Sequence, residues 1–287
     1  VLVFKPSYGG SLVEWDWRDR RYNLLNTMTR REEGYHESLR QAAEQGRLFL
    51  PGDPEIPGGV KVKRRDIHTC LFYDRHRRVA LMDHFLHADT TPESFYQARY
   101  SEEGDFIGEP YQATVEESDG QAVLLMTREG TVSVGQVAFP VRVEKHACVL
   151  ADSGSLQVHY RVTNLDDIPA DLRFGVEFNW GIVGGDSSHA YLKVGSEERR
   201  LNDLAGDDDV SGFTIGSSLP VLAGEVRVIP SRPTSLWHFP LEVVSNSEAG
   251  YECAYQGTCT LLWWAMHLEA RRPWEVELTL ELRDSRT

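Results

Sequence analysis

The feature that most constrains this chain is an apolar alternation with a period of two residues, which recurs along most of its length. Residues 156–163 read L-Q-V-H-Y-R-V-T, so their four apolar side chains fall on one face. Side chains of a β-strand point alternately to the two faces of its sheet, so this pattern indicates a half-buried strand. Similar signals predict strands at residues 11–17, 122–127, 131–138, 141–150, 172–180, 224–229, 258–266 and 274–282. Many short strands with little helix predict an all-β sandwich or barrel.

Two segments have a helical composition instead. Residues 35–45 are rich in helix formers and end before Gly46, a residue type that commonly follows the last turn of a helix. Residues 92–98 predict a second, short helix. We also expect a loop at residues 202–212. Hairpin turns are expected at residues 119–120 and 129–130, where glycine accepts the positive φ that such turns need.

The predicted elements form one unit rather than a string of domains. A chain of 287 residues is long enough for one large core, and no flexible linker or internal repeat divides it. We expect residues 1–65 to supply strands, a helix and a loop that pack on the main β-sandwich, and residues 66–287 to form that sandwich. The chain does not begin with Met, and we expect it to be part of a longer product.

The charge of the chain excludes two classes of partner. It holds 30 basic and 44 acidic residues, a formal net charge of −14. Nucleic acids and anionic membranes are bound by basic surfaces, so we expect neither as a partner. No apolar run reaches the roughly 18 residues that a membrane span needs. A neutral ligand such as a sugar is compatible with this charge.

Four cysteines are too few and too scattered for a disulfide framework. Cys70, Cys148, Cys253 and Cys259 match no CxxC metal or redox motif. We interpret them as free thiols in a reducing compartment and predict a cytoplasmic protein. The alternative is a bridge between Cys253 and Cys259 across a hairpin.

Aromatic and amide residues in the second half of the chain point to a sugar site. A flat aromatic ring covers the apolar face of a pyranose, and amides bind its hydroxyl groups. The run V-E-F-N-W ends a predicted strand beside a glycine-rich loop, and Y-Q precedes Gly257. We therefore predict an exposed Trp180, against the alternative that the tryptophans fill the core. The predicted carbohydrate-binding residues are Asn179, Trp180, His238, Tyr255 and Gln256.

Other polar residues suggest proton transfer or metal binding. Glu177, His159 and His238 can act as acid and base in the ring opening of an aldose, provided that they meet in one open cleft. The alternative is a structural role for each. His84 and His87 are three residues apart, and in a strand they face opposite sides, so we predict no metal site there. We predict no cofactor.

Two blocks of sequence carry a family resemblance. The first block runs from G-G-S-L-V-E-W-D-W at Gly9, through N-L-L-N-T-M-T-R-R-E-E-G-Y-H, to L-M-D-H-F-L at residues 81–86. The second holds Y-R-V-T-N at residues 160–164, V-E-F-N at 176–179, and S-N-S-E-A-G-Y-E-C-A-Y-Q-G at 245–257. In this order the motifs resemble the C-terminal region of glycoside hydrolase family 57, the 4-α-glucanotransferase and α-amylase type.

The resemblance implies a large twisted β-sandwich, similar in shape to galactose mutarotase. In that family the catalytic Glu and Asp belong to an N-terminal incomplete barrel that has no counterpart here, so no catalytic residue is assigned. The implied role is an accessory domain that braces the barrel and binds α-glucan or maltooligosaccharide. Residues 29–36 would lie on the barrel side. The candidates for interdomain contact are Arg30, Arg31, Glu32, Tyr35 and His36.

Two other functions remain as alternatives. A stand-alone aldose mutarotase or epimerase requires its acid and base to converge in an open cleft. A binding module for a non-sugar partner requires an apolar or charged face without an aromatic groove.

Overall fold

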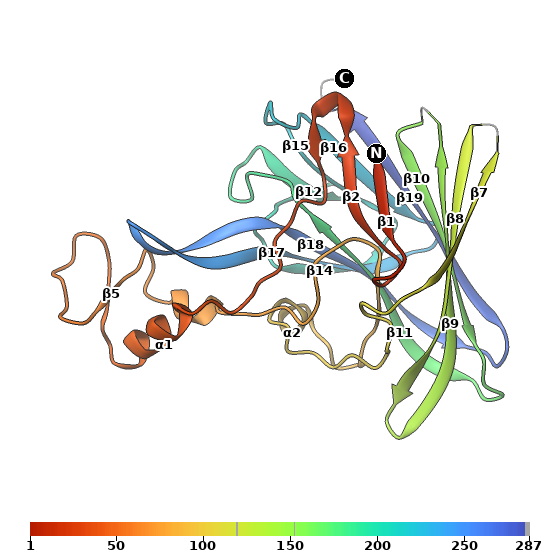
Figure 1. Cartoon of the computed structure of the whole chain (residues 1–287), viewed down its shortest axis with the longest axis horizontal. Coiled ribbons are helices and arrows are strands. Elements are labelled where there is room, and N and C mark those ends of the chain that lie inside the picture. The colour runs from red at the N-terminus through yellow and green to blue at the C-terminus, as the bar shows by residue number, and fades with distance from the viewer. Residues whose placement is uncertain (119, 152, 285–287) are drawn as a thin grey trace.

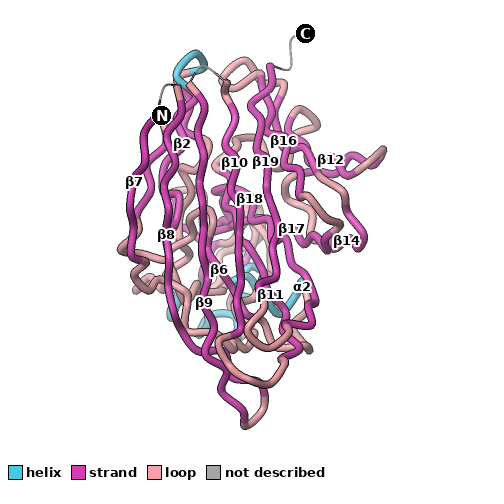
Figure 2. The backbone as a smooth tube through the Cα atoms, turned by 90° about the vertical axis from the view of Figure 1, so that its right-hand side faces the viewer, coloured by secondary structure: helices cyan, strands magenta, loops and turns pink. Residues whose placement is uncertain are grey.

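Two antiparallel sheets lie face to face in the computed structural model, which describes residues 1–118, 120–151 and 153–284 (Figure 1). Figure 2 shows β7 to β10, β19 and β16 of the larger sheet side by side. The nine-stranded sheet has the order β13 (Glu197–Arg200), β12 (Ala190–Val194), β15 (Phe213–Ser217), β16 (Gly224–Pro230), β19 (Pro273–Asp284), β10 (Ser155–Asn164), β9 (Val137–Leu150), β8 (Gln121–Val134) and β7 (Gln112–Ser118). The five-stranded sheet has the order β14 (Ala205–Val210), β17 (Thr234–Ser247), β18 (Gly250–Leu268), β11 (Ala170–Trp180) and β6 (Met82–Phe85). The predicted all-β sandwich is confirmed.

The main core lies between these two sheets, where the alternating apolar side chains meet. Phe174 of β11 makes an edge contact with Tyr160 of β10, with ring centroids 5.7 Å apart. Both side chains are buried, and the cluster around them draws on most strands of both sheets. Burial of apolar area at about 25 cal/mol per Å² makes this cluster the principal stabilising element.

The second face of the five-stranded sheet is covered as well. The short helix α2 (Pro92–Tyr96) places Phe95 against Phe239 and Trp237 of β17. A capping box starts this helix, because Thr91 and Ser94 exchange side-chain to backbone hydrogen bonds. The cover excludes water from both faces of β11, so polar residues on its second face need internal partners.

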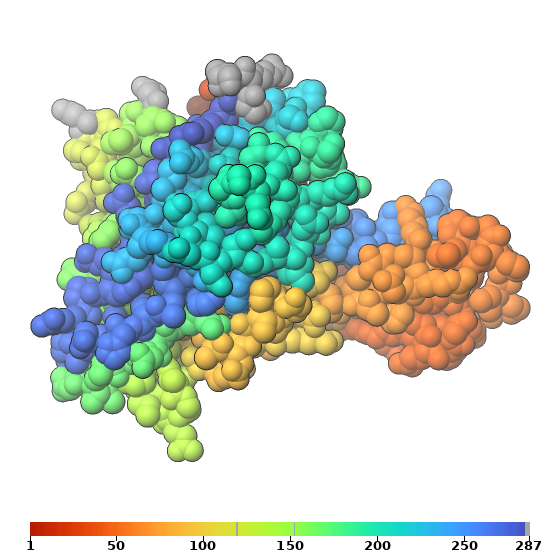
Figure 3. Space-filling model, turned by 180° about the vertical axis from the view of Figure 1, so that it is seen from behind, coloured from red at the N-terminus to blue at the C-terminus, as the bar shows by residue number. Residues whose placement is uncertain are grey.

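The N-terminal part adds a small sheet and a projecting arm. A three-stranded sheet comes first in the chain, and the helix α1 and then the 3-10 helix η2 follow it. The arm, defined here as residues 30–73, projects together with the ends of β17 and β18 (Figures 1 and 3). Its buried Leu39, Val62 and Ile67 pack against Val244 and Tyr251 of those strands. The remaining elements are β1 (Leu2–Lys5), β2 (Ser11–Trp17), η1 (Arg18–Arg20), β3 (Tyr22–Asn23), α1 (His36–Glu44), β4 (Leu48–Phe49), β5 (Val60–Lys61) and η2 (Ile67–Cys70).

Both predicted helices are present as α1 and α2, but two local predictions are wrong. β8 runs straight through the turn expected at residues 129–130. Gly130 is needed there because the Asp105 carboxylate and the Phe106 ring leave no space for a Cβ atom. The loop expected at residues 202–212 contains β14, which pairs with β17.

Three further predictions concern the cysteines, the hairpin turn at residues 119–120 and the division at residue 65. Cys253 and Cys259 both lie in β18, so they cannot bridge a hairpin, and all four thiols are free. β7 and β8 do form a hairpin, with Ser118 opposite Gln121, while Asp119 lies outside the described residues. The division at residue 65 stays a prediction. Among the described residues, no helix is long and apolar enough to cross a membrane.

A buried ion pair joins the N-terminal sheet to both layers of the sandwich. Lys145 of β9 is fully buried, and its Nζ lies 2.9 Å from the carboxylate of Asp83. The same ammonium donates to the carbonyl oxygens of Gly9 and Leu81, both at 2.7 Å. Burial lowers the pKa of Lys145 and raises the pKa of Asp83, and the opposite charge of each partner offsets that shift.

Replacing Lys145 by Met leaves the Asp83 carboxylate buried without its counter-ion. We expect the variant to lose about 3–5 kcal/mol of unfolding free energy, measured by urea denaturation. Lys145→Met combined with Asp83→Asn removes both charges and should lose less than Lys145→Met alone.

The control for this experiment is an exposed ion pair between β9, the strand of Lys145, and its neighbour β8. Arg142 and Glu129 are paired at the surface, and Arg142→Met should cost no more than about 1 kcal/mol. Equal losses for Lys145→Met and Arg142→Met would contradict the structural role of the buried pair.

Candidate functional site

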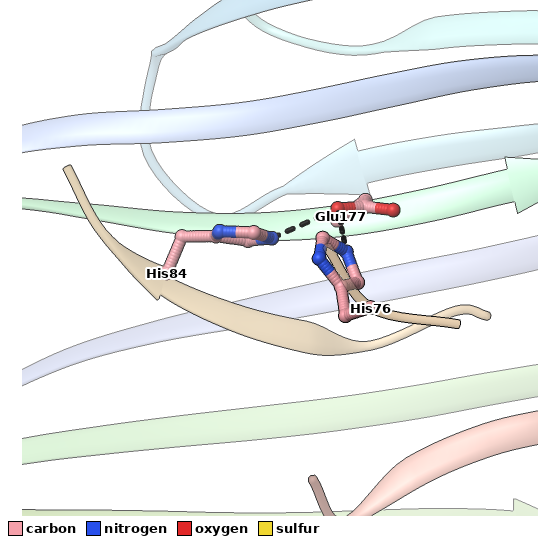
Figure 4. Close-up of side chains that lie close together, drawn as sticks. All are labelled: His76, His84 and Glu177. Carbon is pink, nitrogen blue, oxygen red and sulfur yellow. Dashed lines mark hydrogen bonds and ion pairs between the residues drawn. The ribbon is translucent and has the colours of Figure 1, made fainter. Parts of the chain in front are cut away.

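A carboxylate saturated with hydrogen bonds lies at the centre of a buried polar cluster. Glu177 of β11 is fully buried, and its Oε2 lies 3.0 Å from Nε2 of His76 and 2.8 Å from Nε2 of His84 (Figure 4). Its Oε1 accepts from Arg78 at 3.0 Å and from the amide of Asn179. Four donors therefore converge on one carboxylate.

The cluster continues in two directions as alternating positive and negative groups. Arg78 donates to Asp74 at 2.8 Å, and Asp74 accepts from Arg30 at 2.6 Å. On the other side, Nδ1 of His84 lies 2.9 Å from the carboxylate of Glu102. An internal charge chain therefore runs from Arg30 at the root of the arm to Glu102 beside β6.

The pairing sets the charge of each group. Burial alone would raise the pKa of Glu177, but Arg78 and His76 hold it well below its usual range. Burial alone would lower the pKa of His84, but Glu102 and Glu177 outweigh it and raise that pKa to about 9. At neutral pH the cluster thus holds an ionised Glu177 and a protonated His84.

Three ligand-type atoms of this cluster lie close enough together to be considered as a metal site. The side chains of His76, His84 and Glu177 each offer one donor atom, within 4.8 Å of one another. A metal ligand must be an unprotonated imidazole, whereas His84 is held protonated by two carboxylates. Arg78 already neutralises the same carboxylate. This arrangement fits internal charge pairing better than cation binding.

A cavity of about 460 Å³ lies on the arm, directly over Arg30. We call it the arm cavity. Its wall includes Arg31, Tyr35, Cys70 and Glu242, so positively charged, negatively charged and aromatic side chains line it. Residues from the segment preceding α1, from η2 and from β17 meet here.

The five predicted interdomain residues divide into two groups at this cavity. Arg31 and Glu32 are exposed and Tyr35 is half-buried, whereas Arg30 and His36 are buried. Arg30 is bonded to Asp74, so its contacts are internal. Arg30 and His36 are therefore held by internal contacts in the wall of the arm cavity, and the interdomain role of all five residues stays a prediction.

The hydrogen bonds of His36 explain its burial. The backbone N–H of Glu33 donates to Nδ1 at 3.1 Å, so Nδ1 is an acceptor. Nε2 then carries the proton and donates to the carbonyl of Val244 at 3.0 Å. His36 in this way joins the start of α1 to β17.

The prediction of an exposed Trp180 is wrong. The side chain is fully buried, its ring stacks on Phe178, and its indole N–H donates to Thr260 at 2.9 Å. The cause is the two-residue period of β11, which places Trp180 on the same face as Val176 and Phe178. That alternation is visible in the sequence and outweighs the position of Trp180 at the strand end.

The other four predicted sugar-binding residues do not form one site. Asn179 is buried in the charge cluster, and His238 is buried in β17, where burial lowers its pKa to about 4. Tyr255 and Gln256 line a cavity of about 370 Å³, which we call the tyrosine cavity. Its other lining residues are Arg21, Tyr22, Asn23, Asn26, Gly181, Ile182, Val183 and Gly184. Sequence analysis missed the contribution of residues 21–26, although they overlap the first resemblance block.

The proposed acid–base set does not converge in an open cleft. Glu177 and His238 are fully buried. His159 lies in β10, where its ring faces His146 and its Nε2 is 3.8 Å from Glu275. The condition that the mutarotase alternative placed on these three residues is not met.

The charge cluster makes folding stability depend on pH. Because the pKa of His84 is raised to about 9 in the folded chain, its stabilisation is complete below the unfolded value near 6.5 and is lost as pH rises through 9. Glu102→Gln removes the negative charge and one of the two acceptor oxygens, which bond Nδ1 of His84 and the N–H of Phe85. We expect the stability advantage of the wild type over Glu102→Gln, measured by urea unfolding, to fall by about 2 kcal/mol between pH 6.5 and 9.5.

An exposed histidine close to the cluster provides the control. His87→Gln should leave the pH profile of stability unchanged, because His87 is exposed and lies outside the cluster. A pH-independent difference between Glu102→Gln and the wild type would contradict the assignment of a protonated His84.

Comparison with known proteins places the chain. The family model "Alpha-amylase/4-alpha-glucanotransferase, C-terminal" matches residues 1–278. The alpha-amylase 1 of Dictyoglomus thermophilum is 25% identical over 277 residues, which make up 96% of this chain and 38% of that protein. The crystal structure of the 4-alpha-glucanotransferase of Thermococcus litoralis has a TM-score of 0.72 at 25% identity, covering 98% of this chain and 35% of that one.

The chain thus spans little more than a third of these enzymes. A galactose mutarotase-like protein of Clostridium acetobutylicum shares the fold, with a TM-score of 0.57 at 10% identity, covering 99% of this chain and 92% of that one. The resemblance stated from the sequence motifs is confirmed by the family match. The chain belongs to the family of C-terminal domains of alpha-amylases and 4-alpha-glucanotransferases.

Proposed function

We propose that this chain is the non-catalytic accessory domain of an α-glucan-acting enzyme. The observation that carries the proposal is the family match over residues 1–278, together with coverage of 38% and 35% of two longer enzymes. The state of Glu177 supports it, because a carboxylate that accepts from four internal donors is not available to a substrate. We place the protein in the cytoplasm, where its four free thiols stay reduced.

The proposed partner is an N-terminal catalytic domain in the same longer chain, docked at the arm. Arg31 and Glu32 are exposed beside the arm cavity, and Glu242 adds a negative charge to its wall. Exposed charges of both signs suit a polar interface between domains of one chain. The bond between Arg30 and Asp74 fixes the backbone that presents these side chains.

The proposed glucan contact is the tyrosine cavity. Tyr22 and Tyr255 supply aromatic rings, while Asn26 and Gln256 supply amides. This combination suits a neutral sugar, since rings cover its apolar face and amides bind its hydroxyl groups. The hydroxyl of Tyr22 already donates to Gly181 at 2.7 Å, which holds that ring in place.

Calorimetric titration with maltoheptaose tests this proposal. We expect millimolar binding, about −4 kcal/mol. Asn26→Ala combined with Gln256→Ala should raise Kd about tenfold, because each lost hydrogen bond is worth about 0.5–1.5 kcal/mol. The control, Gln136→Ala, changes an exposed glutamine in the turn between β8 and β9 and should leave Kd unchanged.

Product analysis in the same samples separates the two parts of the proposal. The chain alone should release neither glucose nor shortened maltooligosaccharides. Turnover by the purified chain would overturn the accessory role. Equal affinity of the wild type and the double variant would exclude the tyrosine cavity as the glucan site.

A further inference from the structure

Two cysteines that are far apart in the sequence meet where the arm packs on the β17–β18 ribbon. Cys70 is the last residue of η2, and Cys253 lies in β18 opposite Val244 of β17. The arm segment that ends in Cys70 packs on the part of β18 that holds Cys253. Both side chains are half-buried against the same apolar cluster. This contact depends on tertiary structure and has no signature in the cysteine spacing.

The backbone on both sides of the pair is fixed. The N–H of Lys63 donates to the carbonyl of Tyr251 at 2.8 Å, and Val62 forms a parallel bridge with the same residue. Tyr251 lies two residues before Cys253. Buried Ile67 anchors η2 in the same cluster three residues before Cys70. The two sulfurs are therefore held next to each other by the fold.

The groups around Cys70 favour its thiolate. The neighbouring thiol of Cys253 lowers the pKa of Cys70 to about 6, against the opposing effect of burial. Nη2 of Arg64 donates to the same sulfur at 3.0 Å and adds a positive charge, whereas Glu242 opposes the shift. The thiolate is the nucleophilic form of cysteine, so Cys70 is the more nucleophilic of the two sulfurs.

Small molecules in solvent can reach Cys70, whereas they cannot reach Cys259. Cys70 lines the arm cavity. Cys259 is fully buried, and burial raises its pKa. Cys148 is half-buried in β9 and hydrogen-bonded to Gln121, on a different sheet from Cys253.

We propose that Cys70 and Cys253 are a reversible thiol–disulfide pair that is oxidised by hydrogen peroxide. The Cys70 thiolate attacks one peroxide oxygen, the O–O bond breaks, and Cys70 becomes a sulfenic acid while hydroxide leaves. The sulfur of Cys253 then attacks Cys70, the S–O bond breaks, and the S–S bond forms. The proton of Cys253 leaves with the hydroxyl group as water. The pair loses two electrons, and the peroxide gains them.

The disulfide would add a covalent link between the arm and the ribbon. It sets the sulfurs about 2.05 Å apart, so the two side chains move closer. The link fastens the wall of the arm cavity, because Cys70 lies in that wall. This inference goes beyond the proposed function and does not depend on it.

Peroxide treatment of the reduced wild-type chain at neutral pH tests the pair. We expect the intact mass to fall by about 2 Da, corresponding to the two hydrogens lost on disulfide formation, and dithiothreitol to reverse the change. Peptide mapping without reduction should find Cys70 linked to Cys253 within one chain. In Cys253→Ser, we expect dimedone to trap the sulfenic acid at Cys70, with no disulfide formed.

Two further variants separate the built pair from ordinary thiol oxidation. Arg64→Gln should slow the oxidation of Cys70 by peroxide about fivefold or more, because the thiolate loses its positively charged neighbour. Cys148→Ser should leave the rate and the product unchanged. Three results would overturn the proposal. In the wild type, Cys148 is oxidised as fast as Cys70, or the dominant disulfide joins other cysteines or two chains. In Arg64→Gln, the oxidation rate of Cys70 is unchanged.

Discussion

A carboxylate removed from water needs a full set of internal partners, and this requirement at Glu177 organises much of the molecule. Glu177 lies on the second face of β11, opposite the side chains that form the main core. Three of its donors, His76, Arg78 and His84, come from β6 and the segment that leads into it. That segment must therefore cross the face of the sheet, where α2 follows and completes the cover.

The same requirement reaches the surface through Asp74. Asp74 is buried between Arg78 and Arg30, and burial would raise its pKa if these two cations did not lower it to about 2. Arg30 begins the arm, so the projecting part of the molecule is anchored in the charge pairing of the core. The arm is also held by apolar packing of Ile67 against the β17–β18 ribbon. A projection fixed by both contacts presents a preorganised surface, which lowers the entropic cost of docking.

The sequence predicted what depends on neighbours along the chain and missed what depends on distant pairing. Alternation gave most strands, and composition gave α1 and α2. The same alternation already placed Trp180 in the core, so that error came from weighing strand position above the pattern. The contact of Glu177 with His84 follows from the register of β11 against β6, in which Gly175 faces His84. No local pattern encodes such a register across 93 residues.

Charge saturation also limits what the buried cluster around Glu177 can do chemically. A general acid or base must exchange a proton with a substrate, so it needs access and an unfilled hydrogen-bond position. Both oxygens of Glu177 are filled by protein donors, and His84 is fixed between two carboxylates. Breaking such a buried pair costs about 3–5 kcal/mol, which works against any motion that would expose these groups. The arm cavity and the tyrosine cavity lie elsewhere, where the arm and residues 21–26 meet the sheets, so the two proposed contacts do not use this cluster.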